Sequence, residues 1–318
     1  MDAGKSGLMI PADDYVVVFR TTNSDVRGRL VRLGRAADGI LAPHAMPEVP
    51  SVVLGEALAL TALLSSALPD DGRIILQTRT EGVVSLIVSD CAASGGLRGY
   101  ARYDQEMLSV IAEAGRSLDP ASVLGDGLLA LTIETGPDRQ RTQGVLGLEG
   151  APLASAAMAY FEQREALPTY VNLAVAQHYS VNSDLPKSGL QWRAGGLMLQ
   201  DELRQREASD DDDLRDGWSR VRHLAQTVKD HELLDPALRA ETLLVRLFHE
   251  EGVVIERVTP IKAECRCAGR DNLLATLKSF GSEKLGALYD DDGRIVAVCE
   301  FCLAQNIFTQ AELKPKPL

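Results

Sequence analysis

The sequence predicts an α+β protein in three parts: an N-terminal mixed α/β core domain with a mainly antiparallel sheet, a helical linker module and a small C-terminal zinc-binding domain. Three observations lead to this prediction. Strand-like segments joined by short turns dominate residues 1–199, residues 200–256 are acidic with helical periodicity, and four of the five cysteines lie in residues 257–318. Strands and helices do not alternate strictly, so the pattern does not favour a mainly parallel sheet.

The first part consists mostly of strands. β-Branched and apolar residues bounded by turn residues predict neighbouring strands at residues 15–20 and 26–33. A helix at residues 50–68, with Ser51 as its N-cap, carries only the charge of Glu56, so we expect other elements to cover most of its sides. The other expected elements are strands at 73–80, 83–90, 97–103, 128–134, 142–146, 169–179 and 191–199, and a helix at 153–164.

The second part is an acidic helical module. Residues 201–256 contain 15 Asp and Glu against 8 Lys and Arg, which is more than half of the acidic excess of the chain. Apolar residues at helical spacing predict one helix at 214–228 and another that begins with Asp235 as N-cap and Pro236 at its first position. Two interpretations remain open on composition alone: an ordinary helical hairpin packed on the first domain, or a hinge that can come loose.

The third part contains two close pairs of cysteines. Cys265 and Cys267 are separated by one residue, Cys299 and Cys302 by two, and 31 residues lie between the pairs. This spacing predicts a tetrahedral site in which all four cysteines bind one zinc ion per chain, because thiolate is a ligand that zinc prefers. Four protein ligands leave no open position for a catalytic water, so the site is expected to be structural or redox-active. The alternative is four cysteines that bind no metal.

The elements expected around the cysteines are short. They are a strand at 256–260, helices at 271–280 and 282–289, a strand at 294–298 and a last helical turn with capping-box spacing from Thr309 to Glu312. So few apolar residues can hardly form a stable core unaided. Bound metal would therefore have to supply the missing free energy of folding.

Composition and charge argue against several classes of protein. The chain has 318 residues and a net charge of −12, which does not favour nucleic acid as a partner. Residues 261–318 contain eight basic and eight acidic residues, without the basic excess of a nucleic-acid-binding zinc ribbon. No secretory leader or membrane-spanning run is evident, so we expect a cytoplasmic protein that does not bind membranes and whose thiols stay reduced.

The remaining candidate residues give weaker signals. Cys91 follows a strand and has no cysteine neighbour, so it is interpreted as a small buried residue. All five histidines lie outside the cysteine region, and surface or core positions are more probable for them than metal binding. An enzyme site in the first domain is the rival hypothesis, although no spacing singles out its candidate residues. The histidines are His44, His178, His223, His231 and His249, and the enzyme candidates are Arg98, Tyr103, Glu134 and Gln163.

The cysteine pattern near the end of a chain of this length resembles that of the heat-shock protein 33 family of redox-regulated chaperones. The resemblance extends from about Asp14 to about Leu313, and the cysteines are its most specific element. Other stretches that agree are Leu97–Arg102, Tyr160–Gln163, Leu167–Thr169 and Ala194–Gly196 followed by Gln200.

The resemblance implies a holdase that works without ATP, is inactive while reduced and zinc-bound, and is activated by oxidants. Neighbouring thiols would form the disulfides Cys265–Cys267 and Cys299–Cys302, and the loss of ligands would expel the zinc. The helical module would then lose its docking surface, and the exposed apolar area would bind unfolded client proteins. A homodimer is one state expected of the oxidised form. The alternatives are a zinc-stabilised enzyme and a nucleic-acid-binding zinc ribbon.

Overall fold

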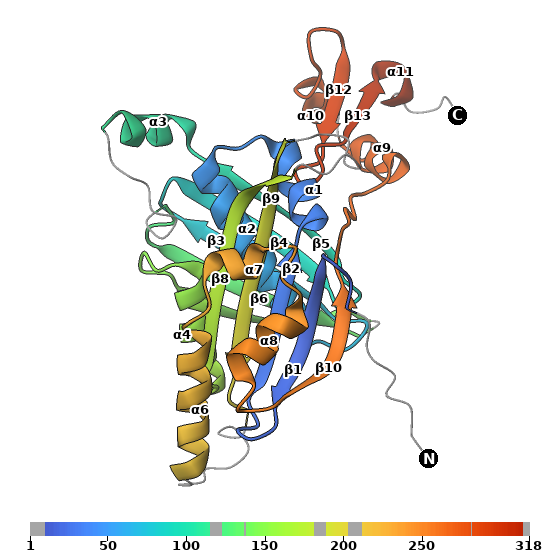
Figure 1. Cartoon of the computed structure of the whole chain (residues 1–318). Helices are drawn as coiled ribbons and strands as arrows, with labels where there is room; N and C mark the ends of the chain where they lie inside the picture. The colour runs from blue at the N-terminus through green and yellow to red at the C-terminus, as the bar shows by residue number, and fades with distance from the viewer. Residues whose placement is uncertain are drawn as a thin grey trace. The chain divides into compact units, whose positions relative to one another are not determined.

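The chain divides into two compact units, residues 1–263 and 264–318. The computed structural model describes residues 10–114, 123–136, 138–180, 189–202, 212–280 and 282–313. Two sheets and several helices form the first unit, and a two-stranded sheet with short helices forms the second (Figure 1). The predicted α+β class with mainly antiparallel sheets is confirmed.

The first sheet has five antiparallel strands. Its order is β10 (Val253–Pro260), β1 (Tyr15–Thr21), β2 (Arg27–Leu33), β9 (Gly189–Gln200) and β8 (Thr169–Ser180). Side chains of a strand point alternately to its two faces, and here both faces are covered, which is why β1 reads as a continuous apolar run. Val16 packs on one side with the central helices, whereas Tyr15 and Val17 pack on the other side with the helical module.

The second sheet has six strands. Its order is β11 (Lys262–Ala263), β5 (Gly96–Tyr103), β4 (Val84–Ala92), β3 (Arg73–Thr80), β6 (Gly127–Thr135) and β7 (Gln140–Gly147). Its pairings are antiparallel except that of β11, which lies parallel to β5 through Lys262 and Ala263. The strand β10 precedes β11 by a single residue, so the chain passes directly from one sheet to the other.

Helix α2 (Glu48–Ser65) lies between the two sheets and contacts strands of both. Among the described helices it alone is long and apolar enough to cross a membrane, but 78% of it is buried in the protein, as in the core helix of a soluble protein. The predicted cap at Ser51 is wrong: the helix begins at Glu48, because Pro50 needs no backbone donor within a first turn. The other helices beside these sheets are α1 (Arg35–His44), α3 (Gln105–Glu113) and α4 (Leu153–Glu165).

Three helices of the acidic region cover the other face of the first sheet (Figure 1). They are α6 (Asp212–Ala225), α7 (Asp230–Leu234) and α8 (Ala240–Phe248). The predicted helix start at Asp235 is wrong, because the Asp235 carboxylate accepts a hydrogen bond from the Ala237 N–H and forms a turn instead. The predicted strand at 256–260 exists, but it is part of β10 in the first unit and not the entry to the second.

The second unit is built from short elements around a small core. They are α9 (Arg270–Lys278), α10 (Ser282–Gly286), β12 (Arg294–Val298), β13 (Gln305–Thr309) and α11 (Gln310–Leu313). Strands β12 and β13 pair antiparallel. The predicted capping interaction is confirmed, since the Glu312 carboxylate accepts hydrogen bonds from the N–H and the hydroxyl of Thr309. The four buried apolar side chains of this core are Leu277, Ile295, Phe308 and Leu313.

Candidate metal centre

The four cysteines of the second unit lie on two turns. Cys265 and Cys267 lie between β11 and α9, and Cys299 and Cys302 lie between β12 and β13. In the second turn the Leu303 N–H donates to the Cys299 carbonyl at 2.8 Å. Leu303 itself has a φ of 58°, a left-handed conformation that returns the chain toward β13. Each turn thus presents two thiols to the other turn.

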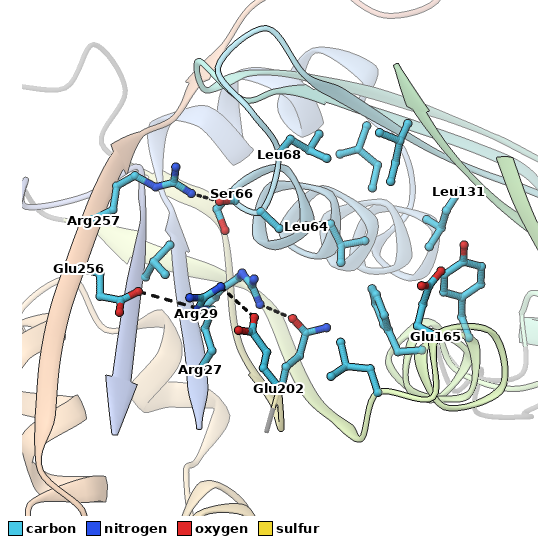
Figure 2. Close-up of a pocket in the computed structure, with 18 residues that line it drawn as sticks. Arg27, Arg29, Leu64, Ser66, Leu68, Leu131, Glu165, Glu202, Glu256 and Arg257 are labelled. Carbon is cyan, nitrogen blue, oxygen red and sulfur yellow. Dashed lines mark hydrogen bonds and ion pairs between the residues drawn. The ribbon is translucent and has the colours of Figure 1, made fainter. Parts of the chain in front are cut away.

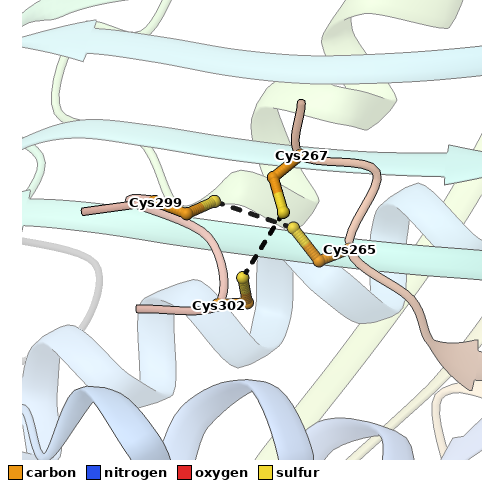
Figure 3. A group of neighbouring side chains, drawn as sticks. All are labelled: Cys265, Cys267, Cys299 and Cys302. Atoms are coloured by element: carbon orange, nitrogen blue, oxygen red, sulfur yellow. Dashed lines mark hydrogen bonds between the residues drawn. The ribbon is translucent and has the colours of Figure 1, made fainter. Parts of the chain in front are cut away.

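The thiols converge on one point (Figure 3). The Sγ atoms of Cys265 and Cys299 are 3.7 Å apart, those of Cys267 and Cys302 are 3.9 Å apart, and all four lie within 4.8 Å of one another. A tetrahedral zinc site with Zn–S bonds of about 2.3 Å has S–S edges of about 3.8 Å. The four sulfurs therefore have the spacing of a metal site, and the two turns bring all four predicted ligands together.

The thiols differ in how readily they lose a proton. Burial, together with hydrogen bonds to neighbouring thiols, raises the pKa of Cys265 to about 12. Burial acts in the same direction on Cys299, but hydrogen bonds from the N–H groups of Cys302 and Phe301 outweigh it and hold the Cys299 pKa below its usual range. A cation bound among the sulfurs would favour the thiolate form of all four, because a thiol that coordinates zinc is deprotonated.

A network around Arg270 fastens α9 to the strand pair beside the cysteines. The Arg270 guanidinium lies 4.8 Å from the centre of the Phe308 ring and donates to the Ile307 carbonyl at 3.0 Å. It also pairs with Glu312 at 2.6 Å. These contacts lie on the surface, where each adds little to stability. The described residues of this unit form a core with four buried apolar side chains, so we expect its stability to depend on the cysteine cluster.

No histidine joins a metal site within the described residues, where the four cysteines are the only group of three or more His, Cys, Asp or Glu that could hold an ion. His178, His231 and Arg193 line a surface pocket of about 430 Å³. Cys91 is fully buried in the main core, as predicted.

The candidate enzyme residues do not form a catalytic site. Arg98 pairs with buried Asp90 at 2.8 Å, and Arg73 joins Asp90 to Glu134 across the second sheet at 2.8 and 3.6 Å. This chain of ion pairs runs through strands β5, β4, β3 and β6 and is a structural contact between strands. Gln163 lies exposed on α4, and no described interaction connects Gln163 or Tyr103 to these ion pairs.

The surface on which the helical module docks was only partly predicted. Val221, Leu247 and Phe248 are buried against the first sheet, and the Phe248 ring stacks on Phe19 with 5.7 Å between centres. Trp218, one of the apolar residues at helical spacing in 214–228, is only half-buried. The sequence signal for Phe248 was its place in the apolar row of the second helix.

Two buried arginines of the first sheet hold α7, and neither was predicted from the sequence. Arg32 is 1% exposed and donates to the carbonyl oxygens of Glu232 at 2.7 Å, Asp235 at 3.1 Å and Leu238. Arg193 donates to the Leu234 carbonyl at 2.6 Å and pairs with Asp13 at 2.7 Å. The unsatisfied carbonyls at the C-terminal end of α7 thus find donors within the sheet. Arginines in strands that are otherwise apolar are the signal that could have revealed them.

Close approach of α7 also explains a glycine pair in β9. A Cβ on Gly195 would lie 2.7 Å from the Leu233 carbonyl oxygen in α7, and one on Gly196 would lie 2.9 Å from the Leu173 side chain on the other face. A backbone atom cannot move aside cheaply, so Gly195 is required where the helix crosses the sheet.

The fold and the thiol cluster together define a class: a two-unit α+β protein whose small C-terminal unit carries a four-cysteine group that could hold a metal ion. The family model described as "Hsp33 protein" matches residues 14–309. The chain belongs to the Hsp33 family, which confirms the resemblance drawn from the cysteine spacing.

Related proteins from several bacteria are named "33 kDa chaperonin". The chain is 40% identical over 294 residues to the "33 kDa chaperonin" of Caulobacter vibrioides, covering 91% of this chain and 93% of that protein. It is 34% identical over 303 residues to the "33 kDa chaperonin" of Ectopseudomonas mendocina, covering 95% and 94%. The family is one of chaperones and not of enzymes, so this chain is a chaperone.

A solved structure shows the same fold. The crystal structure of the 33 kDa chaperonin from Thermotoga maritima, a heat shock protein 33 homolog, matches with a TM-score of 0.74 at 22% identity, covering 95% of this chain and 96% of that one.

Proposed function

We propose that this protein is a redox-regulated chaperone that holds unfolding proteins without ATP and is inactive while its four cysteines bind zinc. The observation that carries the proposal is the convergence of four thiols within 4.8 Å in a unit whose described residues include four buried apolar side chains in its core. When bound, zinc would supply the cross-link that fixes the two turns and the free energy that folds the unit.

Oxidation would remove the ligands in pairs. One hydrogen peroxide molecule accepts two electrons from two thiolates, takes up two protons and leaves as two waters, while one S–S bond forms. The pairs proposed are Cys265–Cys267 and Cys299–Cys302, because an oxidised sulfur is readily resolved by its neighbour in sequence. In the reduced cluster each sulfur also lies close to one from the other turn, at 3.7 and 3.9 Å, so proximity alone does not select the pairs.

Loss of the second unit would act on the helical module through the chain that joins them. The module rests on the first sheet by Phe248 and by the Arg32 contacts, and it covers an apolar face that includes Tyr15, Val17 and Phe19. A short module depends for most of its stability on the surface on which it docks. Once it is released, this face and the apolar row of the helices would be free to bind unfolded proteins.

The central test measures zinc, free thiols and chaperone activity together before and after peroxide treatment. The expected result is one zinc per reduced chain, loss of four thiols with loss of the zinc, and suppression of aggregation of several unrelated clients only after oxidation. Each single Cys→Ser variant at 265, 267, 299 and 302 should lose zinc, whereas Cys91→Ser, outside the cluster, should retain it. Full zinc retention in a cluster variant would remove that cysteine from the ligand set.

Peptide mapping of the oxidised protein tests the pairing separately. A bond between Cys267 and Cys299 or between Cys267 and Cys302 would overturn the proposed pairs while leaving the redox proposal intact. We further propose that the protein acts in the cytoplasm, where reduced thiols persist until oxidants accumulate, without nucleic acid or membrane as partners. A homodimer is proposed as one state of the oxidised form, which sedimentation of both forms would test.

A further inference from the structure

The first unit contains a pocket of about 660 Å³ that is separate from the four clustered cysteines (Figure 2). It lies among β1, β2, β9 and β10 of the first sheet, β3 and β6 of the second, the C-terminal end of α2 and helix α4. Its volume is that of a site for a small organic molecule. Much of its wall is apolar, and the main apolar residues are Leu64, Leu68, Leu131, Ile133, Phe161 and Leu167.

A buried arginine lies in the wall of this pocket. Arg29 is 4% exposed, and its Nη1 donates to the Gln200 side-chain oxygen. Its Nε is buried without a hydrogen-bond partner, and no carboxylate among the described residues forms an ion pair with it. Burial lowers the pKa of Arg29 to about 10, which still leaves it charged at neutral pH. The carboxylates of Glu202 and Glu256 favour the charged form of Arg29 without forming an ion pair with it. A ligand carboxylate could provide the direct counter-ion that a buried charge normally has.

The other charges in the wall are already engaged. Arg27 pairs with Glu202 at 2.9 Å and with Glu256 at 3.9 Å, and Arg257 donates to the Ser66 carbonyl at the end of α2. Glu165 adds a third carboxylate to the lining, which would repel a ligand with several negative charges. The arrangement therefore favours one negative charge over two or more, and it disfavours nucleotides and other polyphosphates.

We propose that this pocket binds a small amphipathic carboxylate, whose one carboxylate group pairs with Arg29 and whose hydrocarbon body lies against the apolar wall. A guanidinium donates parallel hydrogen bonds to a carboxylate, and of the Arg29 nitrogens only Nη1 has a hydrogen-bond partner among the described residues. The site lies wholly within the first unit, so in the reduced protein the ligand would contact none of the four clustered cysteines.

Decanoate is the probe, added to the reduced, zinc-bound full chain below its micelle concentration. The expected result is one decanoate per chain, with NMR shifts confined to the methyl groups of pocket residues such as Leu68, Leu131 and Ile133. Decylammonium has the same hydrocarbon chain with the opposite charge, and it should bind at least tenfold more weakly. Equal binding of the two probes, no binding of decanoate, or shifts spread over other apolar surfaces would overturn the proposal.

Variants test the role of Arg29. Arg29→Gln should weaken decanoate binding at least tenfold and leave decanol binding unchanged, because only the charged head group loses its partner. Arg79→Gln, at an exposed arginine outside the pocket, is the matched control and should bind decanoate normally. Leu131→Trp fills the apolar end and should abolish binding of both probes, which tests the location without changing a charge. Undiminished decanoate binding by folded Arg29→Gln would overturn the pairing.

Discussion

The two compact units of this chain are stabilised in different ways. In the first unit, helix α2 lies between two sheets within one continuous apolar core, and a second apolar cluster joins the helical module to the first sheet. In the second unit, four buried apolar side chains stand beside four thiols and a surface network around Arg270. Burial of apolar area stabilises the first unit, whereas we propose that a metal bound by its cysteines stabilises the second.

This difference in stabilisation determines which of the two units can respond to an oxidant. Oxidants do not change leucine or valine side chains under conditions that oxidise thiolates, so the apolar core of the first unit gives no response. If the cluster binds zinc as we propose, it would convert the same oxidants into loss of structure, because the atoms that oxidants attack would also be the ligands that stabilise the fold. The helical module belongs to the first unit. Its contacts are apolar but it is short, and we expect it to be released when the second unit loses its structure.

The largest expected effect comes from removing the metal. Structural zinc contributes about 10–16 kcal/mol in small domains, more than the core of the second unit can replace. In a reducing buffer with a strong chelator, residues 264–318 should become sensitive to protease while the core around α2 stays protected. Mass spectrometry of the fragments measures this. Equal protection of both units without metal would show that the second unit folds by its apolar core after all.

The next largest effect is expected at the contact between the module and the first sheet. Phe248→Ala removes a fully buried ring stacked on Phe19 and should cost about 3–5 kcal/mol. The reduced variant should suppress client aggregation while its zinc content stays at one per chain. Trp218→Ala, at a half-buried position of the same cluster, is the comparison and should have a smaller effect. A zinc-loaded Phe248→Ala protein whose module is cleaved by protease but which stays inactive would mean that another surface binds clients.

A smaller effect of the same kind is expected at Gly195. A Cβ there meets the Leu233 carbonyl oxygen at 2.7 Å, so Gly195→Ala should push α7 away from the sheet. We expect this to lower the free energy of unfolding by about 1–3 kcal/mol. Gly147→Ala is the matched control, because its Cβ would meet no atom within 4 Å. Hydrogen exchange of the α7 amides measures the loosening. Unchanged exchange in Gly195→Ala would show that the sheet and helix adjust without loss of contact.

The smallest effect is expected at Glu312, in the second unit. Hydrogen bonds from Thr309 and Arg270 lower the pKa of this exposed carboxyl to about 2 in the folded unit, below its ordinary value of about 4.3. Its contribution to stability is therefore complete above the ordinary value and disappears as the pH falls toward the folded value. Glu312→Gln should slightly lower the melting temperature of the second unit, equally at pH 7 and pH 6. A difference that grows between pH 7 and pH 6 would contradict this assignment.

Much of the fold could be predicted because its strands alternate with clear turn residues. The strands from β1 to β9 were found within a few residues of their ends, as was the helix α4. Helix α1 was missed because Asp14, which accepts from the N–H groups of Gly34 and Ala36 at its start, lies twenty residues away in sequence. Strands β11 and β13 are short, and only their partners β5 and β12 define them. The division into three domains stays a prediction that unfolding experiments can address.

The site was easier to predict than its support. The spacing of Cys265, Cys267, Cys299 and Cys302 identified the cluster directly, since ligand type and spacing are local in sequence. Arg29 and Arg32 belong to the same strand, yet one faces a pocket and the other binds α7. Which face each serves depends on residues about 170 to 200 positions away, and no local pattern contains that information.

The order of β10, β11 and Cys265 has a mechanical consequence. The chain leaves the first sheet along its edge strand β10, makes two residues of β11 on the second sheet, and reaches the first cysteine two residues later. We therefore expect a pull from a disordered second unit to open the two pairs of β11 with β5 first and then the pairs of β10 with β1 one after another, beginning at Pro260 and Tyr15. Such peeling needs far less force than shearing a whole strand, because each hydrogen bond is loaded in turn. Strand β10 would thus be the first strand of the sheet to detach, and helix α8, which contacts it, would lose part of its support.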